Sequence, residues 1–199
     1  MKTVAQKLWS KSYTIKNSKF EVSINQITNV AEAETFLQEH QDQKATHNCY
    51  AYIVGFPEQI KRFNDDGEPN KSAGFAILKI LEEKQLTNII VLVRRYFQPP
   101  KLGVGHLMRG YQQGLLNYLA VAKLLAIVPS KEYQIVVPVA LINLIYQWQK
   151  IYHFLILKQT SDDLKVTFII NLAKEKDTLP YHSEVDVTYL KDSFLISAN

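Results

Sequence analysis

Hydrophobic and polar positions along the chain predict short strands arranged around one central strand. Ile89–Val93 is an unbroken apolar run, as expected for a strand covered on both faces. Ser12–Ile15 and Phe20–Ile24 are shorter predicted strands, and the turn formers between them, Lys16–Lys19, predict a hairpin. Asn48–Phe56 has apolar residues at both alternating positions and predicts a further covered strand. The pattern therefore predicts a sheet whose middle is Ile89–Val93.

Apolar residues at three- and four-residue spacing predict three helices in the same part of the chain. The first runs from Val30 to about Gln41, with Asn29 as its N-cap. The second is capped by Ser72 and runs to about Lys84. The third runs from about Gly105 to Ala122, and its core face is predicted to hold Leu107, Met108, Tyr111, Leu115 and Leu119. Strands and helices together predict a mixed α/β domain.

A second pattern begins after the short apolar run Leu124–Val128, which ends at Pro129. We place a domain boundary there, which gives domains 1–129 and 130–199. One helix is predicted, Val139–Tyr152, with an apolar stripe made of Leu141, Leu144, Ile145, Trp148 and Tyr152. The predicted strands are Tyr133–Val137, Phe154–Gln159, Lys165–Leu172 and Ser183–Leu190. This order predicts a small ferredoxin-like α+β sandwich, with a stunted helix or a loop between Ala173 and His182.

Composition is that of a soluble chain with a real core. Apolar residues make up 47% of the 199 residues, and no apolar run approaches the ~20 residues of a membrane span. We expect a cytoplasmic protein with no membrane partner. Cys49 is the single cysteine, so no intrachain disulfide is possible.

Positive charge is concentrated before residue 131. Residues 1–130 contain 16 Lys and Arg against 11 Asp and Glu, a balance of +5, whereas residues 131–199 contain 7 against 8, a balance of −1. A moderately basic N-terminal part is compatible with RNA or ribosome contact.

Cations and aromatic residues follow the predicted central strand at one edge. Pro99 and Pro100 stop the strand, two glycines provide a turn, and a helix starts near His106, where backbone N–H groups favour an anion. The candidate nucleic-acid or anion-binding residues are Arg94, Arg95, Tyr96, Lys101, Gly103, Gly105, His106 and Arg109. The alternative is a solvated rim, or arginines that pair with nearby carboxylates. The glycine pattern matches neither a dinucleotide-binding nor a Walker loop.

Three carboxylates, Asp65, Asp66 and Glu68, occupy one polar loop. Such a loop can hold a divalent metal, form a turn, or pair with arginines, and it lacks the ligand spacing of an EF-hand. We expect no metal or cofactor. Since buried unpaired charge is costly, we predict a salt bridge between this loop and Arg94, Arg95 or Arg109.

His47 and Cys49 fall on the same face of a predicted strand and could touch. A His–Cys pair is a candidate for nucleophilic catalysis, but a cysteine in an apolar strand is usually a small core residue. No nucleophile elbow and no His-Glu-x-x-His motif is present, so the sequence indicates no reaction and no catalytic residue.

Four segments in order resemble the YigZ/Impact family. They are Lys16–Phe20, Ala45–Tyr52, Asn64–Pro69 with Ala73-Gly74, and Val93–Phe97 followed by Lys101–Gly105. The resemblance implies an N-terminal α/β fold shared with elongation factor G domain IV and a ferredoxin-like C-terminal domain resembling domain V. It also implies a role in translational control, since eukaryotic relatives bind a ribosome-associated activator of a stress kinase. It carries over no catalytic residue.

The chain departs from the family pattern at three loops. Gln98-Pro99 replaces Gly-Gly, Val104 and His106 interrupt a Gly-Thr-Gly-Gly-Leu pattern, and Lys71-Ser72 replaces Gly-Thr. Because lost glycines restrict close backbone approach, a phosphate gripped by backbone N–H groups of these loops would be held less well, or differently, than in the family.

The combined prediction is a non-enzymatic, translation-associated regulator or binding protein that contacts RNA or the ribosome through its N-terminal domain. One alternative is a protein–protein regulator of translation without RNA contact. A second is a metal-dependent hydrolase that uses the region of His47, Asp65, Asp66 and Glu68.

Overall fold

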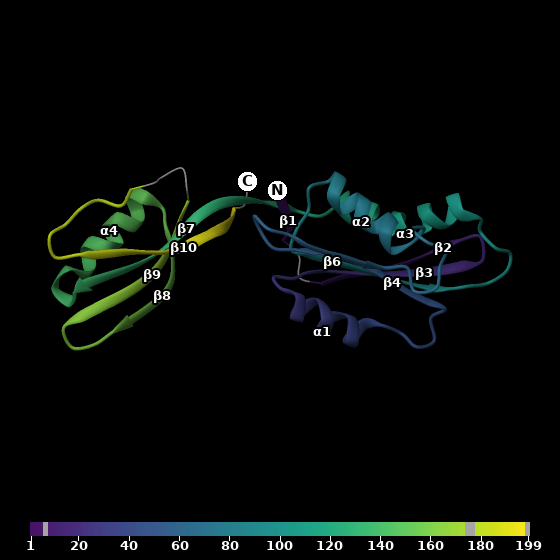
Figure 1. Ribbon diagram of the computed structural model, residues 1–199, viewed down its shortest axis with the longest axis horizontal. Coiled ribbons are helices and arrows are strands. Elements are labelled where there is room, and N and C mark those ends of the chain that lie inside the picture. Colours follow the sequence, from purple (N-terminus) through teal and green to yellow (C-terminus); the bar gives the residue numbers. More distant parts are fainter. Residues whose placement is uncertain (6–7, 174–177, 198–199) are drawn as a thin grey trace. The chain divides into compact units, whose positions relative to one another are not determined.

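The computed structural model describes residues 1–5, 8–173 and 178–197, which form two compact units (Figure 1). The units are Met1–Ala126 and Ile127–Ser197, so the division falls a few residues before the predicted boundary. A single strand, β7 (Leu124–Pro138), runs through this point, so the predicted strand Tyr133–Val137 is too short and the apolar run Leu124–Val128 belongs to the same strand. Pro129 lies between the segment of β7 that pairs with β1 and the segment that pairs with β9, so its missing N–H costs neither ladder a hydrogen bond.

The first unit is built on a five-stranded antiparallel sheet in the order β2–β3–β6–β4–β5. The strands are β2 (Leu8–Ile15), β3 (Ser18–Gln26), β6 (Ile89–Tyr96), β4 (His47–Val54) and β5 (Ile60–Asn64). The predicted hairpin is confirmed, with longer strands and a two-residue turn in which Lys16 has a φ of 50°. The pattern did not predict β5 because all five of its residues are exposed.

Helices cover both faces of this sheet (Figure 1). Helix α1 (Val30–His40) lies on one face, and α2 (Gly74–Glu83) and α3 (Val104–Leu119) lie on the other. Alternate residues of β6 enter the two cores: Val91 packs on the α2/α3 side and Leu92 on the α1 side. The prediction of a central strand covered on both faces is therefore confirmed.

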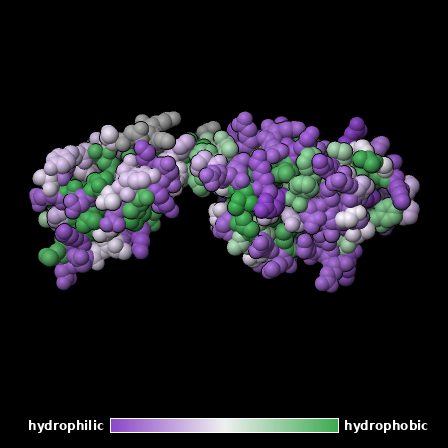
Figure 2. All heavy atoms as spheres, in the orientation of Figure 1, coloured by the Kyte–Doolittle hydropathy of each residue, from purple (hydrophilic) through white to green (hydrophobic). Residues whose placement is uncertain are grey.

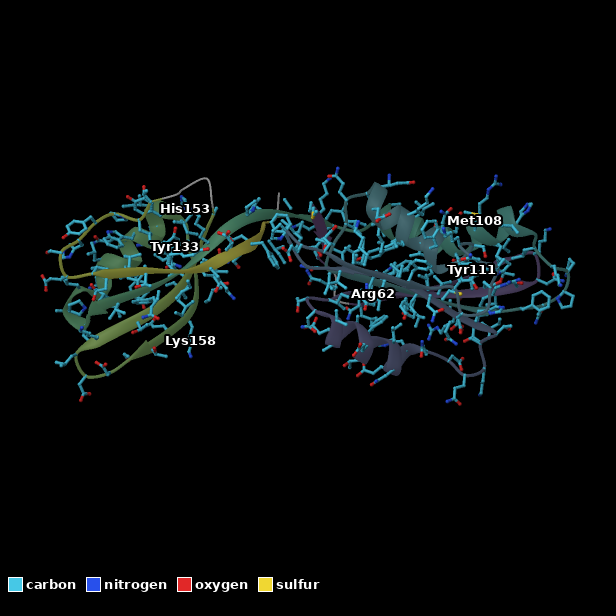
Figure 3. All side chains as sticks on the ribbon, in the orientation of Figure 1. Arg62, Met108, Tyr111, Tyr133, His153 and Lys158 are labelled. Atoms are coloured by element: carbon cyan, nitrogen blue, oxygen red, sulfur yellow. The ribbon has the colours of Figure 1, made fainter. Side chains whose placement is uncertain are left out.

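Two glycines bring α3 close to the sheet. A Cβ atom added to Gly110 would lie 2.7 Å from the Phe20 ring, and one added to Gly114 would lie 2.8 Å from Val22. Such distances are too short for a real side chain, so these glycines permit the close approach. Tyr111, between them, is fully buried and meets Phe20 edge-on at a centroid distance of 5.4 Å. Figure 3 shows Tyr111 on the sheet side of α3. This packing fixes where the N-terminus of α3 lies.

Strand β1 (Lys2–Val4) completes the first unit, where it pairs antiparallel with residues Leu124–Ala126. Asn29 caps α1 as predicted, since its Oδ1 accepts a hydrogen bond from the Glu32 N–H at 2.9 Å. Among the described helices, none is long and apolar enough to cross a membrane.

The second unit packs one α-helix on a sheet. Strand β9 (Lys165–Ala173) lies between β7 and β8 (Leu155–Ser161), both pairings are antiparallel, and β10 (Asp186–Ser197) pairs with β7. Residues Val139–Leu141 form a 3₁₀ turn, so α4 covers Ile142–Tyr152 rather than starting at Val139. The predicted helix stripe is confirmed: Ile145 and Trp148 are buried, and Leu141, Leu144 and Tyr152 pack against the same core.

The segment expected to hold a stunted second helix falls partly on residues 174–177, which lie outside the described residues. Residues 178–185 form no helix. Figure 2 shows that the visible face of the first unit is mostly hydrophilic, with separate hydrophobic areas.

Candidate functional site

The two arginines after the central strand lie on opposite faces of the sheet. Strand β6 does not end at Val93 but continues to Tyr96, pairing Arg94 with Glu21 and Arg95 with Phe20. Because side chains alternate along a strand, Arg94 and Tyr96 point to the α1 face and Arg95 to the α2/α3 face. The prediction that Arg94, Arg95 and Tyr96 gather at one edge beyond the strand is wrong.

Arg95 is buried and forms an ion pair with Glu68. Its Nη1 lies 2.7 Å from Glu68 Oε1, and Nη2 donates to Ser18 Oγ at 3.2 Å. The side chains of Arg95 and Glu68 are only 6% and 4% exposed. The Tyr111 hydroxyl donates to the same Glu68 oxygen at 2.6 Å. The predicted salt bridge between the acidic loop and the arginines is confirmed, and it neutralises Arg95, which is no exposed phosphate ligand.

The other two carboxylates of the loop hold its own backbone. Asp65 accepts hydrogen bonds from the N–H groups of Lys71 at 2.7 Å, Ala73 at 3.1 Å and Phe75 at 3.3 Å. Asp65 therefore caps α2 from a distance, and the predicted Ser72 cap is wrong, since the Ser72 hydroxyl donates to the Pro69 carbonyl at 2.6 Å. Asp66 Oδ2 accepts from the Asn48 N–H.

These hydrogen bonds leave the loop poorly suited to a metal. Within the described part of the chain, no group of three or more His, Cys, Asp or Glu side chains could hold a metal ion. The hydrolase alternative therefore gains no support from the loop.

Cys49 is not an activated nucleophile. Its thiol donates to the Asp65 carbonyl at 3.1 Å, and burial raises the pKa of the thiol, which keeps it protonated. His47 Nδ1 is 2.7 Å from the Asp66 carbonyl oxygen, while Nε2 is 3.7 Å from Glu68 Oε1. His47 is thus oriented by the acidic loop rather than by Cys49.

A cavity of about 440 Å³ on the α2/α3 face is lined by residues of the last three family-like segments. The lining residues are Thr46, His47, Gly67, Glu68, Pro69, Arg95, Phe97, Lys101, Leu102, Gly103, Val104 and Leu107. Thr46 Oγ1 accepts from the Phe97 N–H at 3.0 Å, which ties the residue before β4 to the segment after β6. The cavity therefore unites strand ends, the acidic loop and the start of α3.

The N-terminus of α3 opens at this cavity without a side-chain cap. Gly103 precedes the helix with a φ of 72°, a conformation that favours glycine. Lys101 and Gly103 line the cavity, and Gly105, His106 and Arg109 are exposed on α3. No ion pair or hydrogen bond holds the side chains of Lys101, His106 and Arg109 to other described residues. Of the predicted anion-binding set, five residues thus remain available at or near the cavity.

Arg94 and Tyr96 belong to a second polar cluster on the α1 face. Arg94 donates to the His40 carbonyl at 2.8 Å and to Ser23 Oγ at 3.0 Å, and its Nη2 lies 3.6 Å from Glu21 Oε2. The Tyr96 hydroxyl donates to Asp42 Oδ2 at 2.6 Å. The cluster ties the end of α1 to the sheet, so these two residues have a structural role.

Hydrogen bonding in this cluster lowers two carboxyl pKa values. The Tyr96 hydroxyl, with the Lys44 N–H, holds the pKa of Asp42 below its ordinary value, and Lys19 does so for Glu21. Their contribution to stability is therefore present above the ordinary carboxyl pKa of about 4 and is lost as the pH falls through the lower folded-state pKa.

We expect Tyr96→Phe to raise the pKa of Asp42, because it removes the hydroxyl donor and leaves the carboxylate intact. Carboxyl ¹³C chemical shifts followed by NMR against pH measure this directly. Asp162 is a matched control, since backbone N–H groups of Leu164 and Lys165 lower its pKa in the second unit. An unchanged Asp42 titration, or equal shifts at both residues, would contradict the assigned cause.

Comparison with known proteins identifies the family. The model of the Impact N-terminal domain matches residues 16–119, just over half of the chain. The chain therefore belongs to the Impact family. The cavity and all four family-like segments fall within the matched region.

Curated relatives match over the same region. The chain is 37% identical over 114 residues to the IMPACT family member YvyE of Bacillus subtilis, which is 55% of this chain and 52% of that protein. It is 34% identical over 107 residues to the IMPACT family member YigZ of Escherichia coli, 51% of this chain and 52% of that protein. The chain spans about half the length of the curated relatives it matches.

The fold extends over both units in a solved structure. A protein described as "Crystal structure of an hypothetical protein" aligns with a TM-score of 0.62 and 25% identity, covering 88% of this chain and 86% of that chain. This likeness covers more of the chain than the matched family domain does.

Sequence reasoning missed two contributors to the site. Tyr111 was predicted only as a core residue of its helix stripe, yet its hydroxyl bonds Glu68. Thr46 lies within a family-like segment, but nothing in the apolar pattern indicates that it joins Phe97. A buried tyrosine needs a hydrogen-bond partner, which is the signal that could have linked Tyr111 to the acidic loop.

Proposed function

We propose that this protein is a non-enzymatic, translation-associated binding protein of the cytoplasm, and that its first unit contacts RNA, such as that of the ribosome, at the cavity. The observation that carries the proposal is the open N-terminus of α3, which lies at a cavity with the uncompensated cation Lys101 on its lining. Unpaired helix N–H groups and a cation both favour phosphate. Phe97, 37% exposed, offers a ring on which a base can stack.

The fold is consistent with this setting. We infer that the first unit is related to elongation factor G domain IV and the second to domain V. Support for the second relation comes from the strand order β10–β7–β9–β8 with a helix between β7 and β8, as in a ferredoxin-like sheet.

Neutralisation of Arg95 changes which residues should meet phosphate. Arg95 forms a buried ion pair with Glu68, and Arg94 pairs with Glu21 on the α1 face. Lys101 and Arg109 are therefore the expected phosphate contacts. Lys101→Ala with Arg109→Ala should weaken RNA binding for all sequences alike and reduce the salt slope by about one per lost contact. Titration of the full chain with ribosomal RNA over a range of salt concentrations measures both effects.

Two further variants make this test specific. Lys79→Ala removes an exposed cation from α2 and should leave the salt slope unchanged. A Cβ atom added at Gly105 would meet nothing within 4 Å, so Gly105→Ala should keep the fold while obstructing a phosphate at the helix start. If the double variant binds RNA like the parent chain at every salt concentration, the proposal is wrong.

A protein-partner function is a second candidate, favoured by the edge strand β5. Ile60 and Phe63 on this strand are 45% and 39% exposed, and an exposed strand edge can pair with a peptide from a partner. Such binding would be insensitive to the loss of Lys101 and Arg109 and would be weakened by Phe63→Ser.

A further inference from the structure

Two hydrogen-bond acceptors in the cavity have no partner in the described residues. Glu68 uses Oε1 for Arg95 and Tyr111, and no hydrogen bond reaches its Oε2. His47 Nδ1 must carry a proton, because the Asp66 carbonyl at 2.7 Å can only accept. In a neutral ring Nε2 is then an acceptor, and at 3.7 Å from Glu68 Oε1 it makes no hydrogen bond there. Both residues line the cavity, and the 3.7 Å between His47 Nε2 and Glu68 Oε1 shows that their side chains are neighbours there.

One donor beside them is also unsatisfied. The Nε of Arg95 is buried without a hydrogen-bond partner, although both Nη groups are bonded. A buried donor left unpaired is costly, and a ligand with an acceptor next to its donors would offer Arg95 a partner after a small side-chain shift.

The other lining residues of the cavity suit a flat, largely apolar ligand. Phe97, Leu102, Leu107 and Pro69 line the cavity, and its volume of about 440 Å³ lies within the range of small-ligand pockets. Phe97 already packs against the Arg95 guanidinium, 5.2 Å from the ring centroid, which holds the ring in place for stacking.

We propose that the cavity binds a guanine base of unpaired RNA, an inference that rests on the proposed function. Guanine presents adjacent donors, N1–H and N2–H₂, next to the acceptor O6. N1–H would meet Glu68 Oε2, and N2–H₂ would meet His47 Nε2. Adenine and cytosine each present a single amino group beside an unprotonated ring nitrogen, and uracil presents one N–H between two carbonyls. The phosphate of the same nucleotide would lie at Lys101 and the start of α3.

Calorimetric titration of the full chain with GMP and with IMP at low salt tests the base contact. IMP lacks only the N2 amino group. A hydrogen bond with a charged or well-placed acceptor contributes roughly a factor of ten, so we expect GMP to bind about tenfold tighter than IMP. Equal affinities for GMP, IMP and AMP would overturn the proposal.

Substitution of the acceptors should change this preference selectively. His47→Ala should lower GMP affinity to that of IMP and leave IMP binding nearly unchanged, whereas His182→Ala in the second unit should change neither. Glu68→Gln should weaken GMP and IMP alike where the variant folds, because both bases carry the N1–H that meets Glu68, and His47→Ala decides the matter where it does not. A preference for GMP that survives His47→Ala would overturn the assigned contact.

Matched RNA strands separate this inference from the function on which it rests. A short oligouridylate with one central guanine should bind tighter than the same strand with inosine. Salt-dependent binding that is equal for both strands would refute the guanine site and leave RNA contact standing. A GMP preference without binding of either strand would retain the guanine site for a free nucleotide and refute the RNA function.

Discussion

Replacing Glu68 with alanine is expected to lower the free energy of unfolding of the first unit by about 3–5 kcal/mol, because it leaves the Arg95 charge buried without a partner. Both side chains are almost fully buried, with 2.7 Å between Arg95 Nη1 and Glu68 Oε1. The substitution also removes the acceptor of the Tyr111 hydroxyl. Chemical denaturation of the full chain, followed by a probe in the first unit, measures the loss.

An exposed ion pair provides the matched control. Lys61 and Glu82 lie 2.8 Å apart with side chains 41% and 40% exposed, so Glu82→Ala should cost less than about 1 kcal/mol. A loss no larger for Glu68→Ala than for Glu82→Ala would show that Arg95 is solvated, which would contradict the buried ion pair at the base of the cavity.

Replacing Trp148 with alanine is expected to destabilise the second unit by about 3–5 kcal/mol, the usual cost of removing a buried aromatic ring. Trp148 is 6% exposed and belongs to the core formed by α4 with β7 and β9. Ile151 lies on the same helix and is 65% exposed, so Ile151→Ala should change stability by less than about 0.5 kcal/mol.

Thermal unfolding of the two variants beside the parent chain measures this contrast. If Trp148→Ala and Ile151→Ala unfold alike, the face of α4 that meets the sheet has been assigned incorrectly. A large effect of Ile151→Ala alone would place the core on the opposite face of the helix.

Local sequence patterns correctly predicted those features of the fold that depend on residues close together in the sequence. The apolar run Ile89–Val93 needs cover on both faces, and β6 receives it from two separate cores. Asn29 caps α1 through a contact with a residue only three positions away. The end of β6 was mispredicted because burial of Arg95 depends on Glu68, which lies far away in the sequence. Continuity of β7 through Pro129 likewise depends on which segments pair with β1 and β9.

Only part of the candidate site was predicted from the sequence, because most of its contacts join residues that are far apart in the chain. Charge alone indicated that the acidic loop and an arginine must meet, since neither had a local partner. It could not indicate that Asp65 would serve backbone N–H groups of α2 or that Arg94 would face α1. Those outcomes follow from strand alternation beyond the apolar run and from the loop's closure over the helix, which only the folded chain defines.

We propose that RNA binds at the cavity and the start of α3. Amide NMR spectra of the full chain, titrated with ribosomal RNA at low salt, test it most directly. We expect shifts concentrated at Thr46–His47, Gly67–Glu68 and Lys101–Leu107, which disappear as salt is raised. Shifts confined to β5 or to the second unit, or spectra unchanged by RNA, would contradict it.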